Sequence, residues 1–236
     1  MIEQQHRTRV ELAACFRLVA HFGMSELLIV THISARVPGR DGELLIAPDG
    51  WPFDELRASD LITVDRTGAS RRPAELAGHL AIHAARHDAA CVIQTCSIAG
   101  MAVAAQRTGL LPLCQHAMKF HRRIGYHDDE GIVVSQDAPA RLVRDLAHHQ
   151  AMIRRNRGLC AVGRSIAEAF HVMYHLEQAC RVQVAAMSGG GALALPPDSI
   201  AEHAARQYEA FPQPLGQREW PALLRRLDRL DPSYKT

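Results

Sequence analysis

Four side chains that can bind a metal or move protons recur at every fourth position of one segment. They are Glu75, His79, His83 and His87. Residues four apart lie on one face of an α-helix. Two His at this spacing can chelate a metal ion, and a carboxylate one turn earlier could add a ligand. The alternative, which we favour, is a polar stripe at the helix surface or at a subunit contact. The HEXXH motif of metalloproteases is absent.

A second group of candidates, Gln94-Thr95-Cys96-Ser97, follows an apolar segment and precedes a helical pattern. Residues two apart at a strand end point to the same side of a sheet, which groups Gln94 with Cys96. A thiol beside a helix N-terminus can have a lowered pKa and act as a nucleophile. The alternative for Cys96, which we favour, is a buried thiol without a chemical role.

A third candidate site is the turn Asn156-Arg157-Gly158, which separates two apolar segments. If Arg157 is buried there, its guanidinium needs an anionic partner, because an unpaired buried charge is strongly destabilising. That partner is either a carboxylate of a ligand or an Asp or Glu of the chain itself. The sequence leaves both alternatives open.

A mixture of helices and strands must position these residues. Helical periodicity and capping residues predict helices at 5–22, 74–87, 97–106, 138–149 and 165–187, and near 198–210 and 219–230. Short apolar or β-branched segments predict strands at 27–37, 43–47, 61–64, 91–95, 131–135, 151–155 and 159–162. We predict one α/β domain over residues 1–236, with a central, mostly antiparallel sheet flanked by helices and a helical C-terminal tail over 198–236. No predicted strand is followed by GxGxxG, which argues against a Rossmann dinucleotide site.

Composition narrows the classes of function. The 236 residues are 47% hydrophobic and 22% charged, with a net charge of +2, which is typical of globular proteins. This charge does not by itself imply nucleic acid, and no apolar run approaches the roughly 18 residues of a membrane span. We therefore expect neither a nucleic-acid nor a membrane partner. The six Cys form no CxxC pair, which excludes zinc-ribbon and thioredoxin motifs. A polar N-terminus without a signal-peptide pattern leads us to expect a cytoplasmic protein.

The order of six short motifs resembles that of the class II aldolase/adducin family over roughly residues 5–200. The motifs are Thr31-His32-Ile33-Ser34, Ala47-Pro48-Asp49-Gly50, Pro73-Ala74-Glu75, Gln94-Thr95-Cys96-Ser97, Asn156-Arg157-Gly158 and Gly163-Arg164-Ser165-Ile166-Ala167-Glu168-Ala169. The resemblance implies a homotetramer with sites at subunit interfaces. It also implies a divalent metal, held at the positions of Gln94, Cys96 and Arg157, that polarises a substrate carbonyl and stabilises an enediolate.

The chain departs from the family pattern at the residues that carry this chemistry. The family has His at the positions of Gln94, Cys96 and Arg157. Gln is a poor zinc ligand, and Arg cannot ligate because it stays protonated. The family's phosphate-binding positions hold Thr31-His32, Asp49-Gly50 and Pro73-Ala74 instead of small hydrogen-bond donors. We therefore predict no metal, no cofactor and no phosphorylated sugar substrate, while Glu75 keeps the family's acid/base position.

The hypothesis we favour is a metal-independent lyase-type enzyme acting on a small anionic carboxylate or carbonyl substrate. Arg157 would stabilise an anion or enolate, Glu75 would transfer the proton, and Cys96 would be the third catalytic residue. The predicted substrate-binding residues are His32, Gln94, Ser97 and Asn156. One alternative is a non-catalytic, adducin-like binding or scaffold protein. A second is a metal enzyme with relocated ligands, in which Cys96 acts with Glu75, His79 or His32.

Overall fold

A computed structural model describes residues 1–25, 32–65, 74–131, 135–211 and 215–236. The side chains of Ala74 and Glu75 lie outside this description, although their backbone belongs to a helix. One seven-stranded sheet runs through the described residues in the order β3-β2-β1-β4-β7-β6-β5. The strands are β1 His32–Arg36, β2 Leu44–Ile46, β3 Ile62–Val64, β4 Cys91–Thr95, β5 Ile124–His127, β6 Ala151–Arg154 and β7 Gly158–Gly163.

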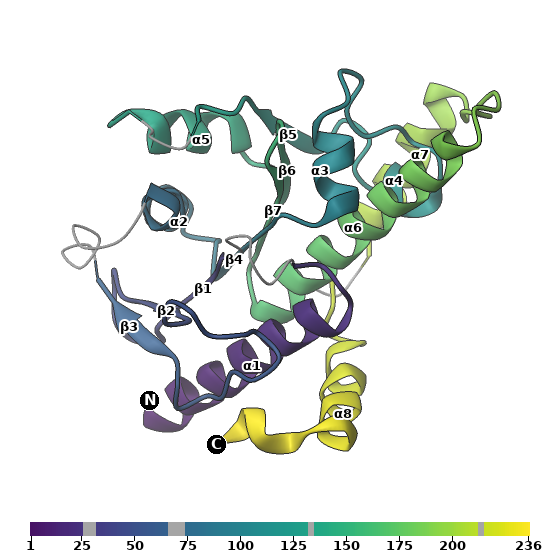
Figure 1. The fold of residues 1–236 in the computed structure, drawn as a ribbon. Helices are drawn as coiled ribbons and strands as arrows, with labels where there is room; N and C mark the ends of the chain where they lie inside the picture. The colour runs from purple at the N-terminus through teal and green to yellow at the C-terminus, as the bar shows by residue number, and fades with distance from the viewer. Residues whose placement is uncertain (26–31, 66–73, 132–134, 212–214) are drawn as a thin grey trace.

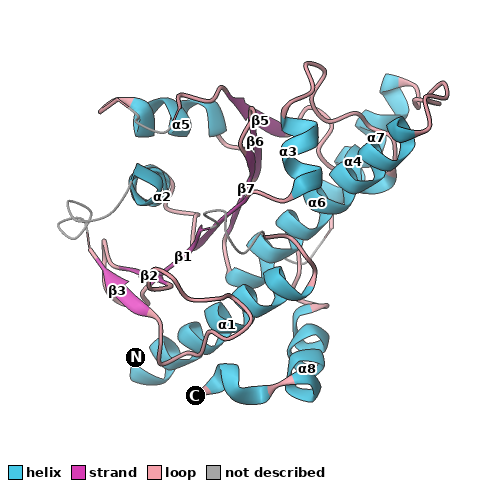
Figure 2. Cartoon of the chain, in the orientation of Figure 1, coloured by secondary structure: helices cyan, strands magenta, loops and turns pink. Residues whose placement is uncertain are grey.

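Helices cover both faces of this sheet (Figures 1 and 2). They are α1 Ile2–His21, α2 Ala74–Ala85, α3 Ile98–Ala104, α4 Gln115–Met118, α5 Ala138–Leu146, α6 Ile166–Ser188, α7 Asp198–Glu209 and α8 Trp220–Leu230, followed by the 3-10 helix η2 Pro232–Lys235. Helices α1, α3 and α6 lie on one side, and α2 and α5 on the other. None of the helices in the described residues has the length and apolar character to cross a membrane.

The strand pairing confirms the predicted fold class. Every neighbouring pair is antiparallel except β5 and β6, which are parallel. The long helix α6 begins as its sequence predicts: Ser165 caps it by accepting a hydrogen bond from Glu168 N at 3.1 Å, and Glu168 accepts one from Arg164 N. The two helices predicted near 198–210 and 219–230 are present as α7 and α8.

The two faces of the sheet bury different sets of alternating residues. Ile93, Ile153 and Ala161 pack toward α1 and α6 in the larger core. Val92, Met152 and Val162, one position along each strand, pack with residues of α2 and α5 in a smaller core. Strands have a side-chain period of two. Neighbouring residues of one strand therefore point to opposite faces of the sheet.

Some predicted boundaries were wrong, and one strand was missed. Helix α2 ends at Ala85, α3 at Ala104 and α5 at Leu146, so the helices predicted to 87, 106 and 149 are shorter. Strand β5 was not predicted, because its sequence Ile-Gly-Tyr-His has little apolar character. A side chain at its Gly125 would lie 2.6 Å from the carbonyl oxygen of Asp145, so the close approach of α5 requires glycine there. Most of the strand predicted at 131–135, and the first part of that at 27–37, lie outside the described residues.

Candidate functional site

The sheet face toward α2 and α5 changes from apolar to polar along its strands. His32 of β1 pairs directly with Gln94 of β4, and His127 of β5 pairs with Arg154 of β6. Gln94 and Arg154 each lie two residues beyond an apolar residue of the smaller core, Val92 and Met152. Because residues two apart share a face, all four polar side chains belong to this face. They form its polar end.

Arg154 is the central side chain of this polar end. Its Nη1 donates a hydrogen bond to Gln94 Oε1 at 2.7 Å, and its buried Nε has no hydrogen-bond partner among the described residues. No carboxylate of the described residues forms an ion pair with it. Burial, together with the nearby Arg157 guanidinium, lowers the pKa of Arg154. The sheet therefore presents a partly buried guanidinium whose buried Nε donor has no partner among the described residues.

Arg157 lies beside it, in the turn between β6 and β7. Its Nη1 is 3.8 Å from Asp129 Oδ1, and its side chain is 25% exposed. The turn is held against the end of β4 by Gly158, where a Cβ would come within 2.1 Å of the carbonyl oxygen of Thr95. A glycine is therefore required at this position. Arg157 is only partly buried, as is Arg154 three residues earlier, but Arg154 has a buried Nε.

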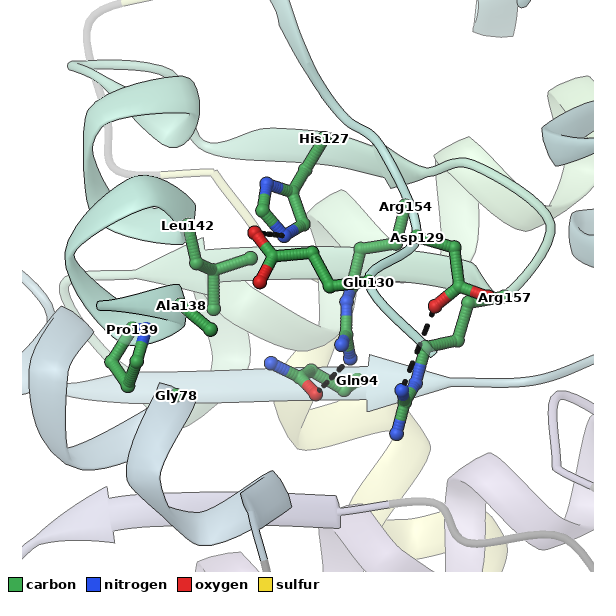
Figure 3. A pocket seen from close by; sticks show the side chains of 10 residues that line it. All are labelled: Gly78, Gln94, His127, Asp129, Glu130, Ala138, Pro139, Leu142, Arg154 and Arg157. Atoms are coloured by element: carbon green, nitrogen blue, oxygen red, sulfur yellow. Dashed lines mark hydrogen bonds and ion pairs between the residues drawn. The ribbon is translucent and has the colours of Figure 1, made fainter. Parts of the chain in front are cut away.

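Two adjoining pockets share Gln94, Arg154 and Arg157. The first, shown in Figure 3, has a wall of Gly78, Ala138, Pro139 and Leu142 from the two helices and a second wall of His127, Asp129 and Glu130. The other pocket is completed by His32, Thr95, Cys96, Gly158 and Leu159. In Figure 3 the Arg154 side chain points to Gln94 between these walls, while Arg157 points past Asp129. Both guanidinium groups therefore face the same small space.

Acidic and histidine side chains on the wall of the first pocket are bound to one another. His127 Nδ1 lies 2.8 Å from Asp145 Oδ2 of α5, and its Nε2 lies 3.9 Å from Glu130 Oε1. Glu130 accepts two hydrogen bonds from Arg141, at 2.7 and 2.6 Å. These bonds hold the pKa of Glu130 below its usual value. The Glu130 carboxylate of this wall is therefore already bound by Arg141.

The sequence-predicted residues divide into those that meet here and those that do not. His32, Gln94, Cys96 and Arg157 line the second pocket together. Ser97 caps α3 and donates a hydrogen bond to Glu177, away from both pockets. Asn156 is exposed at the turn, with a positive φ of 56°. Glu75 belongs to the first turn of α2, but its side chain lies outside the described residues.

The histidine stripe on α2 does not lie on the surface, so that prediction was wrong for His79 and His83. Both are buried, and both bind the hydroxyl of Ser34 on β1, at 2.7 Å from His79 Nδ1 and 2.9 Å from His83 Nε2. His83 Nδ1 lies 2.9 Å from the carbonyl oxygen of Ala89, to which it can only donate. His87 lies beyond the end of α2 and is exposed.

This chain of bonds fixes the proton positions. Because His83 Nδ1 donates, its Nε2 accepts from Ser34, and the Ser34 oxygen then accepts from His79 Nδ1. His79 Nε2 is left as an acceptor without a partner among the described residues. Burial, followed by the nearby His32, lowers the pKa of His79 well below its usual value. Burial also lowers the pKa of His83 to about 4. Both rings are neutral at pH 7.

A model of the Class II Aldolase and Adducin N-terminal domain matches residues 10–184 of this chain. The chain belongs to the class II aldolase and adducin family. A Pseudomonas aeruginosa protein named "Putative aldolase class 2 protein" is 42% identical over 97% of this chain and 92% of its own length. Rat alpha-adducin is 33% identical over 97% of this chain, which corresponds to 34% of the adducin.

Comparison with solved structures agrees with this assignment. The crystal structure of an aldolase II superfamily protein from Pseudomonas syringae matches with a TM-score of 0.91 and 41% identity. The match covers 99% of this chain and 96% of that one. The whole chain, and not a part of it, therefore has the fold of this class II aldolase superfamily member.

The metal that the family resemblance implies does not fit the side chains present at its site. Two of the three positions hold Gln94 and Arg157, and the partly buried Arg154 guanidinium lies against Gln94. Guanidinium groups only donate hydrogen bonds, and they repel a dication. Among the described residues, no group of three or more His, Cys, Asp or Glu could hold a metal ion.

Sequence reasoning missed Arg154, His127, Asp129 and Glu130. Arg154 could have been found from strand alternation alone, because it lies two residues after the apolar Met152 and so shares its face. The other three could not, because His127 ends, and Asp129 and Glu130 follow, a strand that was not predicted. Their place in the pocket depends on the parallel pairing of β5 with β6.

Proposed function

We propose that this protein is a lyase-type enzyme that stabilises an enolate on a small carboxylate or carbonyl substrate without the family metal. The observation that carries the proposal is the Arg154 guanidinium: its Nε donor is buried without a hydrogen-bond partner, and no described carboxylate forms an ion pair with it. A largely desolvated cation of this kind is costly unless an anion pairs with it. A substrate oxygen would be that anion.

The chemistry follows from where the charge develops. Removing a proton next to a carbonyl, or breaking the adjacent carbon–carbon bond, moves an electron pair onto the carbonyl oxygen. Donors already aimed at that oxygen stabilise the transition state more than the ground state. Arg154 Nε and the partly exposed Arg157 would donate to it, and Gln94 would hold Arg154 in place through its 2.7 Å bond.

Glu75 is the proposed proton-transfer group. The motif that begins α2 puts Glu75 at the family's acid/base position, and Gly78, one turn later, lines the first pocket. Cys96 and His32 would line the substrate space beside Arg157. Ser97 and Asn156 are not part of this proposal, because their positions serve the helix cap and the turn.

The proposal also covers the oligomeric state of the protein and its location in the cell. The proposed assembly, which rests on the family resemblance, is a homotetramer with sites at subunit interfaces, and the partly exposed Arg157 is compatible with a site completed by a neighbouring subunit. The proposed location is the cytoplasm, and the proposed partner is a small anionic metabolite rather than nucleic acid or a membrane.

A non-catalytic binding protein is the second candidate. It is favoured by the 33% identity with alpha-adducin over nearly the whole of this chain. The third candidate, a metal enzyme with relocated ligands, would depend on Glu75, because the described residues alone contain no suitable group of three.

A substrate screen with matched variants separates the first candidate from the second. Small 2-oxo acids and 3-hydroxy acids would be incubated with the protein in deuterium oxide, and proton NMR would record cleavage or exchange next to the carbonyl. We expect turnover of at least one acid by the natural protein and by Arg155→Met, and at least a hundredfold loss in Arg154→Met. Arg155 is the matched control because it points to the other face, where it stacks over Tyr126 and binds the carbonyl of Gln106. Equal turnover in the two variants would contradict the role of Arg154.

A further inference from the structure

Another cavity, separate from the two pockets described above, opens at the other end of strands β6 and β7. It is lined by Ala151, which begins β6, and by Arg164, which follows β7, whereas Arg154 ends β6. Three residues along a strand separate these ends by about 10 Å. None of the residues that line this cavity lines the two pockets around Arg154. The cavity is therefore distinct from the candidate active site.

Lys119 provides the buried polar group of this cavity. Lys119 directly follows the short helix α4, and it is only 7% exposed. The Nζ atom has no hydrogen-bond partner among the described residues. Burial lowers the pKa of Lys119 to about 7, against the opposing effects of Glu168 and Glu219. A buried amine with three potential donors and no acceptor is incomplete without a ligand.

The other charges around the cavity already have partners. Arg86 binds Asp88 at 2.7 Å, Arg123 binds Glu209 at 2.9 Å, and Arg164 binds Glu168 at 2.8 Å. All six of these side chains line the cavity. Among the lining residues that the structure describes, these three arginines therefore balance three carboxylates. Lys119 remains as the cation whose charge no lining carboxylate neutralises by contact.

Two of the side chains beside Lys119 in this cavity are apolar. Phe120 and Val172 are both buried and line the cavity with it, and Nζ lies 5.6 Å from the centre of the Phe120 ring. A ligand that fits this surrounding has one negative group for Nζ and an apolar body for the walls. A phosphate dianion fits less well, because it needs several free cationic donors and the arginines are already paired.

We propose that this cavity is a second ligand site, which binds a small monocarboxylate with an apolar body through Lys119. The carboxylate oxygen accepts a hydrogen bond from Nζ, and the body of the ligand packs against Phe120 and Val172. The site does not depend on the function proposed for Arg154, and its binding is measured separately.

The chain offers an unusually direct test, because Lys119 and Lys235 are its two lysines. Protein labelled with carbon-13 at lysine Cε gives one NMR signal for each, and Lys235→Met assigns them. Benzoate, butyrate and inorganic phosphate would be titrated as probes. We expect benzoate to shift the Lys119 signal saturably and to leave the signal of Lys235, which pairs with Asp228 at 2.7 Å, in place. Phosphate should bind at least tenfold more weakly.

The variant Lys119→Met removes the charge and keeps an unbranched side chain of similar length. Calorimetry should show at least a tenfold loss of benzoate affinity in Lys119→Met and none in Lys235→Met. An unmoved Lys119 signal at saturating benzoate, unchanged benzoate affinity in Lys119→Met, or tighter binding of phosphate than of benzoate would each overturn the proposal. The lysine signal of the natural protein decides the question even if the variant folds poorly.

Discussion

Arg154 and Gln94 meet across the strand that separates β6 from β4, with Arg154 Nη1 2.7 Å from Gln94 Oε1. The amide oxygen of Gln94 accepts from the guanidinium, so the pair is compatible in charge and in donor direction. A His at position 94 that served as a metal ligand would have to share this space with a cation. A Gln at position 94 is therefore compatible with the guanidinium of Arg154, whereas a metal-ligating His there is not.

We expect that restoring the three family residues will not by itself create a tight zinc site. The triple variant Gln94→His, Cys96→His, Arg157→His places three imidazoles at the family positions, but Arg154 still repels the ion. Adding Arg154→Met should raise zinc affinity at least tenfold, and Arg157→His alone should bind none stoichiometrically. Zinc per chain after dialysis, measured by mass spectrometry, checks this; equal affinity of the triple and quadruple variants would show that Arg154 does not control the site.

The Ser34 hydroxyl connects two buried histidines, so its loss should be costly. Ser34→Ala leaves His83 Nε2 without its donor and His79 Nδ1 without its acceptor. Leaving such groups unsatisfied costs about 1–3 kcal/mol. We expect a loss of about 2 kcal/mol in the free energy of unfolding measured with urea. Ser188→Ala, at an exposed helix end, is the control and should change it by less than about 0.5 kcal/mol.

Stability should fall as the pH is lowered from about 6.5 to 4. The folded-state pKa of His83 is about 4, whereas an unfolded histidine titrates near 6.5. Between these values the unfolded chain binds more protons, so acid favours unfolding. His83→Gln can keep both hydrogen bonds and cannot titrate, so its free energy of unfolding should fall less over this range, by up to about 3 kcal/mol. The exposed His203→Gln serves as control, and parallel curves for His83→Gln and the natural protein would refute the prediction.

Sequence patterns were sufficient for most of the fold because its central elements carry local signals. The short apolar segments of β4, β6 and β7 and the Ser165–Glu168 cap of α6 are such signals. Strand β5 was not predictable, because four residues with a central glycine carry no pattern until α5 packs against them.

The site was less predictable because its residues satisfy one another over long distances in sequence. His79 and His83 seemed too polar for a core, but the hydroxyl of Ser34, 45 residues before His79, binds both rings. Likewise, the motif drew attention to Arg157, whereas the guanidinium with an unpartnered buried Nε belongs to Arg154, whose partner Gln94 lies 60 residues away. Such partners become visible only when the strand register is known.

Glu75 carries the proton-transfer step of the proposed function. Glu75→Gln keeps the size of the side chain and removes its basicity, so it should fold normally and lose at least a hundredfold in turnover. It should still bind the carboxylate substrate. Deuterium exchange by NMR and the thermal unfolding midpoint together check this; a variant that keeps its activity would place the proton transfer elsewhere.

The central claim is that Arg154 binds an anionic ligand, and the NMR signal of its Nε–H group tests this directly. Nitrogen-15 NMR of the arginine Nε–H groups, with the Arg154 signal assigned from Arg154→Met, would be recorded while acetate and pyruvate are added. The account predicts a saturable shift of the Arg154 signal, with an affinity that falls as salt is raised. The Arg155 signal should not move. An Arg154 signal that no carboxylate moves would contradict the account, and the adducin-like binding role would then be the better explanation.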